Sequence, residues 1–128
     1  MTGQMHALLL ESDVCLARLY GAGLRAAGYT VSVAHHAQDA VALADDRRPD
    51  VLVVDMQLGG HGGMEFLYEF RSYVDWREVP ALLLSAAPPH ALQLSRQQQQ
   101  RLGIADCLYK PATTVQALSR ALNDVCRP

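Results

Sequence analysis

The fold class of this chain is decided by residues 49–65, which run PDVLVVDMQLGGHGGME. Val51–Val54 is uniformly apolar and rich in β-branched residues, which is typical of a central strand in a parallel sheet with both faces covered. Asp55 ends this strand, and a glycine-rich loop at Gly59–Gly63 leads to a helix-period segment over residues 64–73. The strand, the loop and the helix predict one unit of an α/β fold.

Segments of the same two kinds alternate along the rest of the chain. Short apolar or β-branched runs predict strands at residues 6–10, 29–34, 51–54, 80–85 and 106–109. Helical spacing of apolar residues predicts helices from a cap at Asp13 to Gly28, and over 37–48, 64–73, 88–102 and 111–127. This alternation predicts one flavodoxin-like, doubly wound α/β domain over residues 1–128, with five helices and a five-stranded parallel sheet in the order 2-1-3-4-5.

The composition limits the classes of function. The 128 residues are half hydrophobic and carry a formal net charge of −2, so one domain can bury a core, and no basic field attracts nucleic acid or an anionic membrane. Lys110 is the single lysine, and no apolar run is long enough for a signal peptide or a membrane span. The three cysteines are odd in number and form no CxxC pair, which favours a soluble protein in the reducing cytoplasm.

Polar residues follow or end four of the five predicted strands: Glu11-Ser12-Asp13, Asp55, Ser85 and Lys110-Pro111. The carboxyl ends of parallel strands lie at one edge of the sheet, where open α/β folds bind their ligands, so these side chains are expected to meet in one site. Taken alone, some have a structural explanation, Asp13 as a helix cap and Asp55 as the start of a turn. Their joint order favours a functional site.

The residue types at this edge suit phosphoryl transfer. The Asp55 carboxylate is a candidate nucleophile that would form an acyl phosphate. Mg²⁺ prefers oxygen ligands and keeps several waters, so Glu11, Asp55 and the backbone carbonyl of Gln57 are its candidate ligands. The Ser85 hydroxyl and the Lys110 ammonium are the candidates to hold the phosphoryl oxygens.

Over essentially its whole length, the chain resembles the response-regulator receiver family of two-component signalling. The likeness rests on PDVLVVDMQLGGHGGME at 49–65, VPALLLSA at 79–86 and ADCLYKP at 105–111. The resemblance implies that Asp55 is the phosphorylation site, Ser85 the switch hydroxyl and Lys110 the phosphate-binding amine. It also places Gln57 where the family's backbone carbonyl binds the metal.

The function that the resemblance implies is a phosphorylation-dependent signalling switch. Its phosphoryl donor would be a histidine kinase or a phosphotransfer protein. Its output would be a downstream protein target or effector domain, which binds the face formed by the fourth helix, fifth strand and fifth helix. Catalysis would be limited to phosphorylation and dephosphorylation of Asp55, so the chain is not expected to be an enzyme. Direct binding to nucleic acid or membrane is not expected, and a homodimer is left open.

Two residues depart from the family pattern. The family usually ends its first strand with two adjacent acids, whereas this chain has Glu11 and Ser12, with Asp13 one position later as a candidate substitute acting through water. The family also usually has an aromatic switch residue three positions before the lysine. Cys107 stands there in this chain, and Tyr109 lies next to the lysine instead.

A longer segment and two lost residues leave alternatives open. The stretch between Ser85 and Lys110 is longer than usual and contains four glutamines at 97–100, for which a solvated helix face is expected. The missing acid and the missing aromatic residue favour, as an alternative, an atypical pseudo-receiver that acts as a phosphorylation-independent protein interaction module. A flavodoxin-like enzyme or flavin carrier is the third hypothesis.

Overall fold

A computed structural model describes residues 4–58 and 61–126 of the protein. Within these residues, the main sheet has five parallel strands in the order β2-β1-β3-β6-β7. Their bounds are His6–Leu10 (β1), Thr30–Ala34 (β2), Val51–Asp55 (β3), Ala81–Ser85 (β6) and Ile104–Tyr109 (β7). Counted along the chain, this is the predicted order 2-1-3-4-5, so the flavodoxin-like fold class is confirmed.

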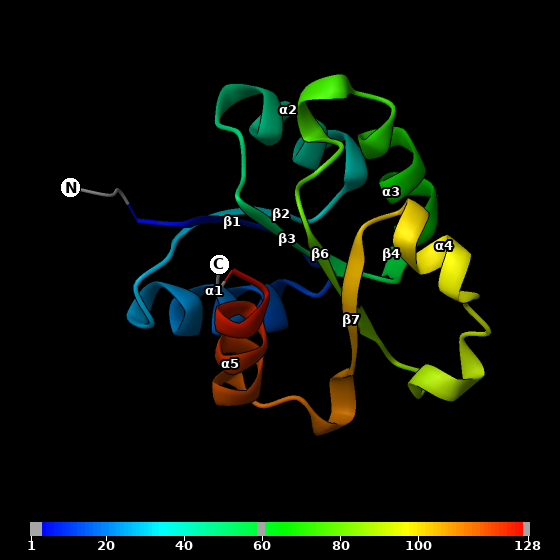
Figure 1. Ribbon diagram of the computed structural model, residues 1–128. Helices are drawn as coiled ribbons and strands as arrows, with labels where there is room; N and C mark the ends of the chain where they lie inside the picture. Colours follow the sequence, from blue (N-terminus) through cyan, green and yellow to red (C-terminus); the bar gives the residue numbers. More distant parts are fainter. Residues whose placement is uncertain (1–3, 59–60, 127–128) are drawn as a thin grey trace.

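Helices cover both faces of this sheet. In the described part of the chain there are five α-helices: Val14–Ala26 (α1), Ala37–Asp46 (α2), Gly63–Arg71 (α3), Arg96–Arg101 (α4) and Val115–Cys126 (α5). Helices α1 and α5 lie on one face of the sheet, and α2, α3 and α4 lie on the other (Figure 1). None of the described helices combines the length and the apolar character that a bilayer span requires.

The sheet separates two hydrophobic cores, because successive side chains of a strand point to opposite faces. Leu8 and Leu10 of β1 pack in the core that contains Phe66 of α3. Leu9, between them, packs in the core that contains Leu118 of α5. Every residue of β1 and β3 is buried, which explains why both strands are nearly continuous apolar runs in the sequence.

The predicted helix over 88–102 is wrong in extent, since α4 occupies only its last turns. A separate 3-10 turn, η2, covers Pro89–Ala91, and Gln93 after it has a φ of 53°, a left-handed conformation that interrupts a helix. Ser95 then begins α4 through a capping box with two hydrogen bonds of 3.0 Å. The glutamine run is exposed except for half-buried Gln99, so the expected solvated helix face is confirmed.

The predicted third and fifth helices also end or begin elsewhere. After α3, the 3-10 turn η1 (Val74–Trp76) folds back, and the Trp76 ring stacks on Phe70 with 4.7 Å between centroids. Before α5, Lys110–Ala112 forms the 3-10 turn η3. The helix begins only after Thr114, whose hydroxyl accepts a helix amide at 3.0 Å. Aromatic stacking and a hydroxyl cap therefore set these two helix ends.

The segment after β3 forms a short hairpin where the sequence predicted a glycine-rich loop. Gln57–Leu58 (β4) pairs antiparallel with His61–Gly62 (β5), and α3 begins directly at Gly63. Residues 59 and 60 of the predicted loop lie outside the described residues. The hairpin brings the start of α3 back to the carboxyl end of β3.

Candidate functional site

The side chains predicted to form the site come from the carboxyl ends of four neighbouring strands. Glu11 follows β1, Asp55 ends β3, Ser85 ends β6 and Lys110 follows β7. Parallel pairing of these strands brings their ends to one edge of the sheet. The exposed fraction is 0% for Glu11 and 1% for both Asp55 and Ser85, and it is 16% for the Lys110 side chain. The structure therefore places all four at one largely buried edge.

Lys110 links the two acids of this edge. Its Nζ lies 2.8 Å from Glu11 Oε1 and 3.5 Å from Asp55 Oδ1. Among the described residues, no donor makes a hydrogen bond of good geometry to Glu11 Oε1. Its close polar contact is therefore this ion pair with Lys110. Pro111 follows the lysine in η3 and restricts the backbone there. Three strands thus contribute one charged side chain each to a single cluster.

Hydrogen-bond donors contact both oxygens of the Asp55 carboxylate. Oδ1 accepts from the backbone amide of Gln57 at 3.1 Å, and Oδ2 accepts from the Ser12 hydroxyl at 3.0 Å. Ser12 Oγ also lies 3.2 Å from the backbone carbonyl oxygen of Gln57. Together with Lys110, these donors provide the contacts that a buried negative charge requires.

The charges of the cluster do not balance. Burial raises the pKa of Glu11 above its usual range and outweighs the opposing ion pair with Lys110 and hydrogen bond from the Asp13 amide, while the Asp55 charge raises it further. Burial alone would lower the pKa of Lys110, but its contacts with the two carboxylates outweigh burial and raise it. Two buried carboxylates therefore share one ammonium, an arrangement that favours a further positive charge.

Ser85 and Asp13 make contacts of a different kind. The buried Ser85 hydroxyl oxygen accepts from the backbone amide of Ala87 at 3.0 Å. Asp13 is exposed, and its carboxylate caps α1 by accepting from the amide of Leu16 at 3.0 Å. The predicted cap is thereby confirmed. The Asp13 side chain therefore caps α1. From this segment, it is the Ser12 side chain that contacts Asp55.

Cys107 stands three positions before Lys110, where the receiver family usually has an aromatic residue, and its small side chain is half-buried. Burial, with a smaller contribution from the Asp106 charge, raises the pKa of Cys107, so the thiol is neutral at neutral pH. Cys107 lines a cavity of about 280 Å³ with residues that include Leu94 and Gln99. Tyr109, the neighbouring aromatic residue, is 37% exposed.

Two residues shape the site in ways that the sequence did not predict. Ser12 stands where the family usually has an acid, yet its hydroxyl lies within hydrogen-bond distance of both Asp55 and Gln57. Gly63 lies so close to β3 that a Cβ atom there would be 2.5 Å from the backbone oxygen of Asp55. The position of Gly63 directly before a predicted helix could have indicated its role. No feature of the sequence indicated the contacts of Ser12.

The donor atoms at this edge suit a hard divalent cation. Glu11, Asp55 and the Gln57 backbone offer oxygen alone, and Mg²⁺ takes one or two carboxylates and retains several waters. In the described ranges, no three His, Cys, Asp or Glu side chains converge as a metal-binding group, so a closed site of the zinc type is not formed there. The excess negative charge of the two buried carboxylates agrees with Mg²⁺.

Solved structures of other proteins share the fold. The chemotaxis protein CheY4 of Vibrio cholerae gives a TM-score of 0.84 at 24% sequence identity, covering 96% of this chain and 99% of that chain. A sensor protein from Polaromonas sp. JS666 gives 0.85 at 23%, covering 95% of each chain. A CheY-like response regulator receiver domain from Methylobacillus flagellatus gives 0.81 at 17%, covering 96% and 99%. At these identities the similarity defines a class of fold.

The family follows from a separate comparison. The family model described as the response regulator receiver domain matches residues 7–123, a range that contains Glu11, Asp55, Ser85 and Lys110. The chain therefore belongs to the response regulator receiver domain family, whose members act in two-component signalling. The resemblance inferred from the three sequence motifs is confirmed.

Proposed function

We propose that this receiver domain accepts a phosphoryl group on Asp55 from a histidine kinase or a phosphotransfer protein, and that phosphorylation shifts it between two signalling states. One observation carries the proposal: the Lys110 ammonium lies 2.8 Å from Glu11 Oε1 and 3.5 Å from Asp55 Oδ1 at the buried edge of the sheet. A carboxylate next to a fixed ammonium, at the ligand-binding edge of a parallel sheet, suits a nucleophile that acquires phosphoryl charge.

In the proposed reaction, a carboxylate oxygen of Asp55 attacks the phosphorus atom of the donor. A new O–P bond forms while the bond between phosphorus and the donor atom breaks, and the donor leaves with the bonding electron pair. The product on Asp55 is an acyl phosphate. Lys110 then donates hydrogen bonds to the phosphoryl oxygens and balances part of their charge.

The proposed ligands of Mg²⁺ are Glu11, Asp55 and the backbone carbonyl of Gln57. When bound, Mg²⁺ supplies positive charge beside the phosphoryl oxygens. Support for this set comes from the all-oxygen donors and from two buried carboxylates that share a single ammonium. Lys110 would keep its ion pair with Glu11 until the phosphoryl group competes for it.

Ser85 is the proposed switch hydroxyl. Its oxygen accepts from the Ala87 amide, so its own hydrogen is available to donate to a phosphoryl oxygen. New charge on Asp55 would then shift the population toward a state in which the segment after β6 moves with Ser85. The proposed output surface is the face formed by α4, β7 and α5, where a downstream protein or effector domain would bind. The chain turns over no outside substrate in this scheme, and a cytoplasmic location is part of the proposal.

The test is incubation with Mg²⁺ and acetyl phosphate, followed by intact-mass measurement. Wild type should gain the mass of one phosphoryl group, and hydroxylamine, which cleaves acyl phosphates, should remove it. Asp55→Asn should gain none. Asp13→Asn is the matched control, because asparagine also caps helices and Asp13 lies outside the cluster. An adduct that persists in Asp55→Asn would exclude Asp55 as the acceptor.

A second outcome of this experiment identifies the alternative function. The absence of any adduct across all Mg²⁺ concentrations, in a folded protein, would favour a phosphorylation-independent interaction module. The observation behind this alternative is the pair of departures at Ser12 and Cys107, which replace an acid and an aromatic residue of the usual pattern.

A further inference from the structure

Ser12 makes the contacts on which a further inference rests. It follows Glu11 directly after β1, and its hydroxyl oxygen lies 3.0 Å from Asp55 Oδ2 and 3.2 Å from the Gln57 carbonyl oxygen. The backbone amide of Ser12 lies 3.5 Å from the same Asp55 oxygen. These two acceptors are two of the three proposed Mg²⁺ ligands. The single hydroxyl hydrogen of Ser12 bonds to one acceptor at a time, so a neutral donor lies within reach of two groups that a cation would contact together.

The distances of 3.0 Å and 3.2 Å from Ser12 Oγ to the two acceptors are ordinary hydrogen-bond lengths, and they are close to the spacing of neighbouring ligand oxygens around Mg²⁺. Mg–O distances of about 2.0–2.1 Å place neighbouring ligand oxygens about 2.9 Å apart. Oxygens at that spacing repel one another unless positive charge lies between them. At Ser12 the hydroxyl hydrogen provides that charge, because it points toward one of the two acceptors. A carboxylate at this position has no hydrogen to offer and would require a cation.

We propose that Ser12 is a positioning residue that holds the Asp55 carboxylate in place beside the Gln57 carbonyl without a divalent cation, and that it makes this receiver bind Mg²⁺ more weakly than an acid at the same position would. The inference rests on the proposed roles of Asp55 and Gln57 toward Mg²⁺. It assigns to this chain a site that is closed by hydrogen bonds when the cation is absent. Its stability should therefore depend little on Mg²⁺.

Three substitutions at Ser12 separate the contributions of hydrogen bonding and charge. Ser12→Asp removes the donor and adds a carboxylate beside Asp55. Ser12→Asn has nearly the same shape as aspartate, keeps a donor and adds no charge, so it is the matched control. Ser12→Ala removes the donor alone. Ser12 is exposed, so all three side chains can be accommodated in the folded protein.

The experiment measures the melting temperature in EDTA and in Mg²⁺, together with Mg²⁺ affinity by isothermal titration calorimetry. Wild type and Ser12→Asn should melt at nearly the same temperature in both buffers. Ser12→Asp should melt at least about 4 °C lower in EDTA, recover in Mg²⁺, and bind Mg²⁺ at least about tenfold more tightly than wild type. Ser12→Ala should lose stability in EDTA to a smaller extent and gain no Mg²⁺ affinity.

The inference is overturned if Ser12→Asp and Ser12→Asn behave alike in both measurements, or if wild type itself melts much lower in EDTA. Phosphoryl uptake separates this failure from failure of the proposed function. If wild type takes up a phosphoryl group but Ser12→Asp gains no Mg²⁺ affinity, only the proposed role of Ser12 is wrong. If Ser12→Asp gains Mg²⁺ affinity but no variant takes up a phosphoryl group, the proposed acceptor is wrong and the role of Ser12 is retained.

Discussion

The two edges of the sheet bury polar groups in opposite ways. At the amino-terminal edge, the ring nitrogens of buried His6 pair with Thr30 Oγ1 at 2.7 Å and Ser32 Oγ at 2.8 Å. The His6 amide donates to Asp50 Oδ2 at 2.7 Å. At the carboxyl edge, the acids Glu11 and Asp55 share the ammonium of Lys110. The amino-terminal edge pairs the buried ring of its histidine with two neutral hydroxyls, whereas the carboxyl edge places two acids beside one ammonium.

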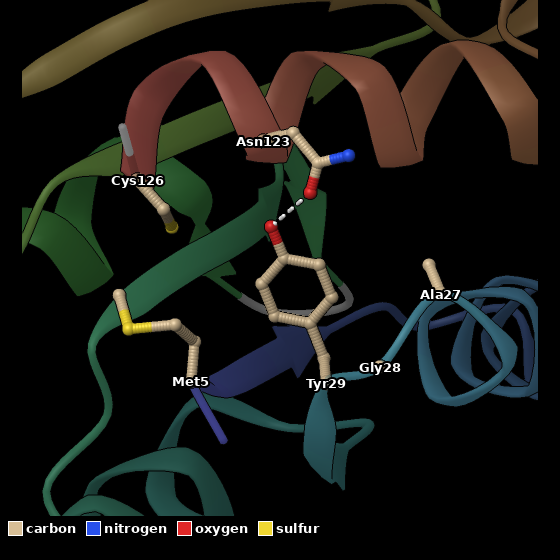
Figure 2. A pocket seen from close by; sticks show the side chains of 6 residues that line it. All are labelled: Met5, Ala27, Gly28, Tyr29, Asn123 and Cys126. Carbon is tan, nitrogen blue, oxygen red and sulfur yellow. Dashed lines mark hydrogen bonds between the residues drawn. The ribbon is translucent and has the colours of Figure 1, made fainter. Parts of the chain in front are cut away.

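A cavity at the amino-terminal edge sharpens this comparison. It measures about 460 Å³ and is lined by uncharged residues: Met5, Ala27, Gly28, Tyr29, Asn123 and Cys126. Figure 2 shows the Tyr29 hydroxyl within this cavity, donating to Asn123 Oδ1 at 2.7 Å. Burial raises the pKa of Tyr29 to about 12, with a further contribution from Cys126, so the phenol remains neutral and its hydrogen bond complete. The carboxyl edge therefore differs from the amino-terminal edge by its unbalanced charge, not by the volume of a cavity.

The largest expected effect is at the carboxyl edge. Lys110→Met removes the one cation of the cluster and leaves two buried carboxylates without a counter-charge, which should lower the free energy of unfolding by about 3–5 kcal/mol. Urea denaturation at neutral pH measures the loss. Arg18→Met, which removes an exposed cation from α1, should change it by less than about 1 kcal/mol. Equal losses in the two variants would contradict the charge imbalance.

A smaller effect is expected where α3 meets β3. Gly63→Ala places a Cβ atom 2.5 Å from the Asp55 backbone oxygen, so the backbone must shift, at a cost of about 1–3 kcal/mol. Phosphoryl uptake should fall as well, because Asp55 moves. Gly62→Ala is the matched control, since its added Cβ meets nothing closer than 3.9 Å. If both alanines behave alike, the close approach at Gly63 has no effect on the site.

The amino-terminal edge should show its own dependence on pH. Burial lowers the pKa of His6 below its usual 6.5, Arg47 lowers it further, and Asp50 opposes the shift. Below about pH 6.5 the unfolded chain binds a proton that the folded chain resists, so stability falls as the pH falls toward the folded pKa. His6→Gln cannot titrate and should flatten this decline in urea denaturation between about pH 7.5 and pH 5.5. An equally steep decline in the variant would assign the dependence to other groups.

The smallest effect is expected at Tyr29. Tyr29→Phe removes the hydrogen bond to Asn123, and because Asn123 is exposed, water can replace the lost donor. The free energy of unfolding should fall by about 1 kcal/mol or less, and phosphoryl uptake should stay at the wild-type level. Thermal unfolding and intact mass measure the two quantities. A marked loss of uptake would show that the two edges are coupled, which the comparison does not predict.

The fold was predictable from the sequence at the strands that are buried on both faces of the sheet, because such strands are runs of apolar residues. Val51–Val54 and Ala7–Leu10 are apolar throughout because helices cover both sides of the sheet, and parallel pairing then brings the polar ends of the strands together. The extent of α4 was not predictable in this way. Gln93 adopts a left-handed conformation that is uncommon for glutamine, and the glutamines after Ser95 suit a longer helix equally well.

The candidate site was predictable in its residues and less so in its contacts. Strand order places Asp55 and Lys110 at the same edge whatever their rotamers, so their meeting follows from topology. The contacts of Ser12 depend on the path of the chain after β1 and on a single side-chain torsion, neither of which the sequence encodes locally. The use of Asp13 as a helix cap was available from the sequence, because aspartate before an apolar helix has that preference.

Chemical mapping of the acceptor tests the central claim most directly. Borohydride reduces an aspartyl phosphate to homoserine, so wild type treated with acetyl phosphate and Mg²⁺ and then reduced can be digested and its peptides sequenced by mass spectrometry. The account predicts homoserine at position 55 and unchanged aspartate at position 13. Homoserine at another aspartate, with Asp55 intact, would contradict it.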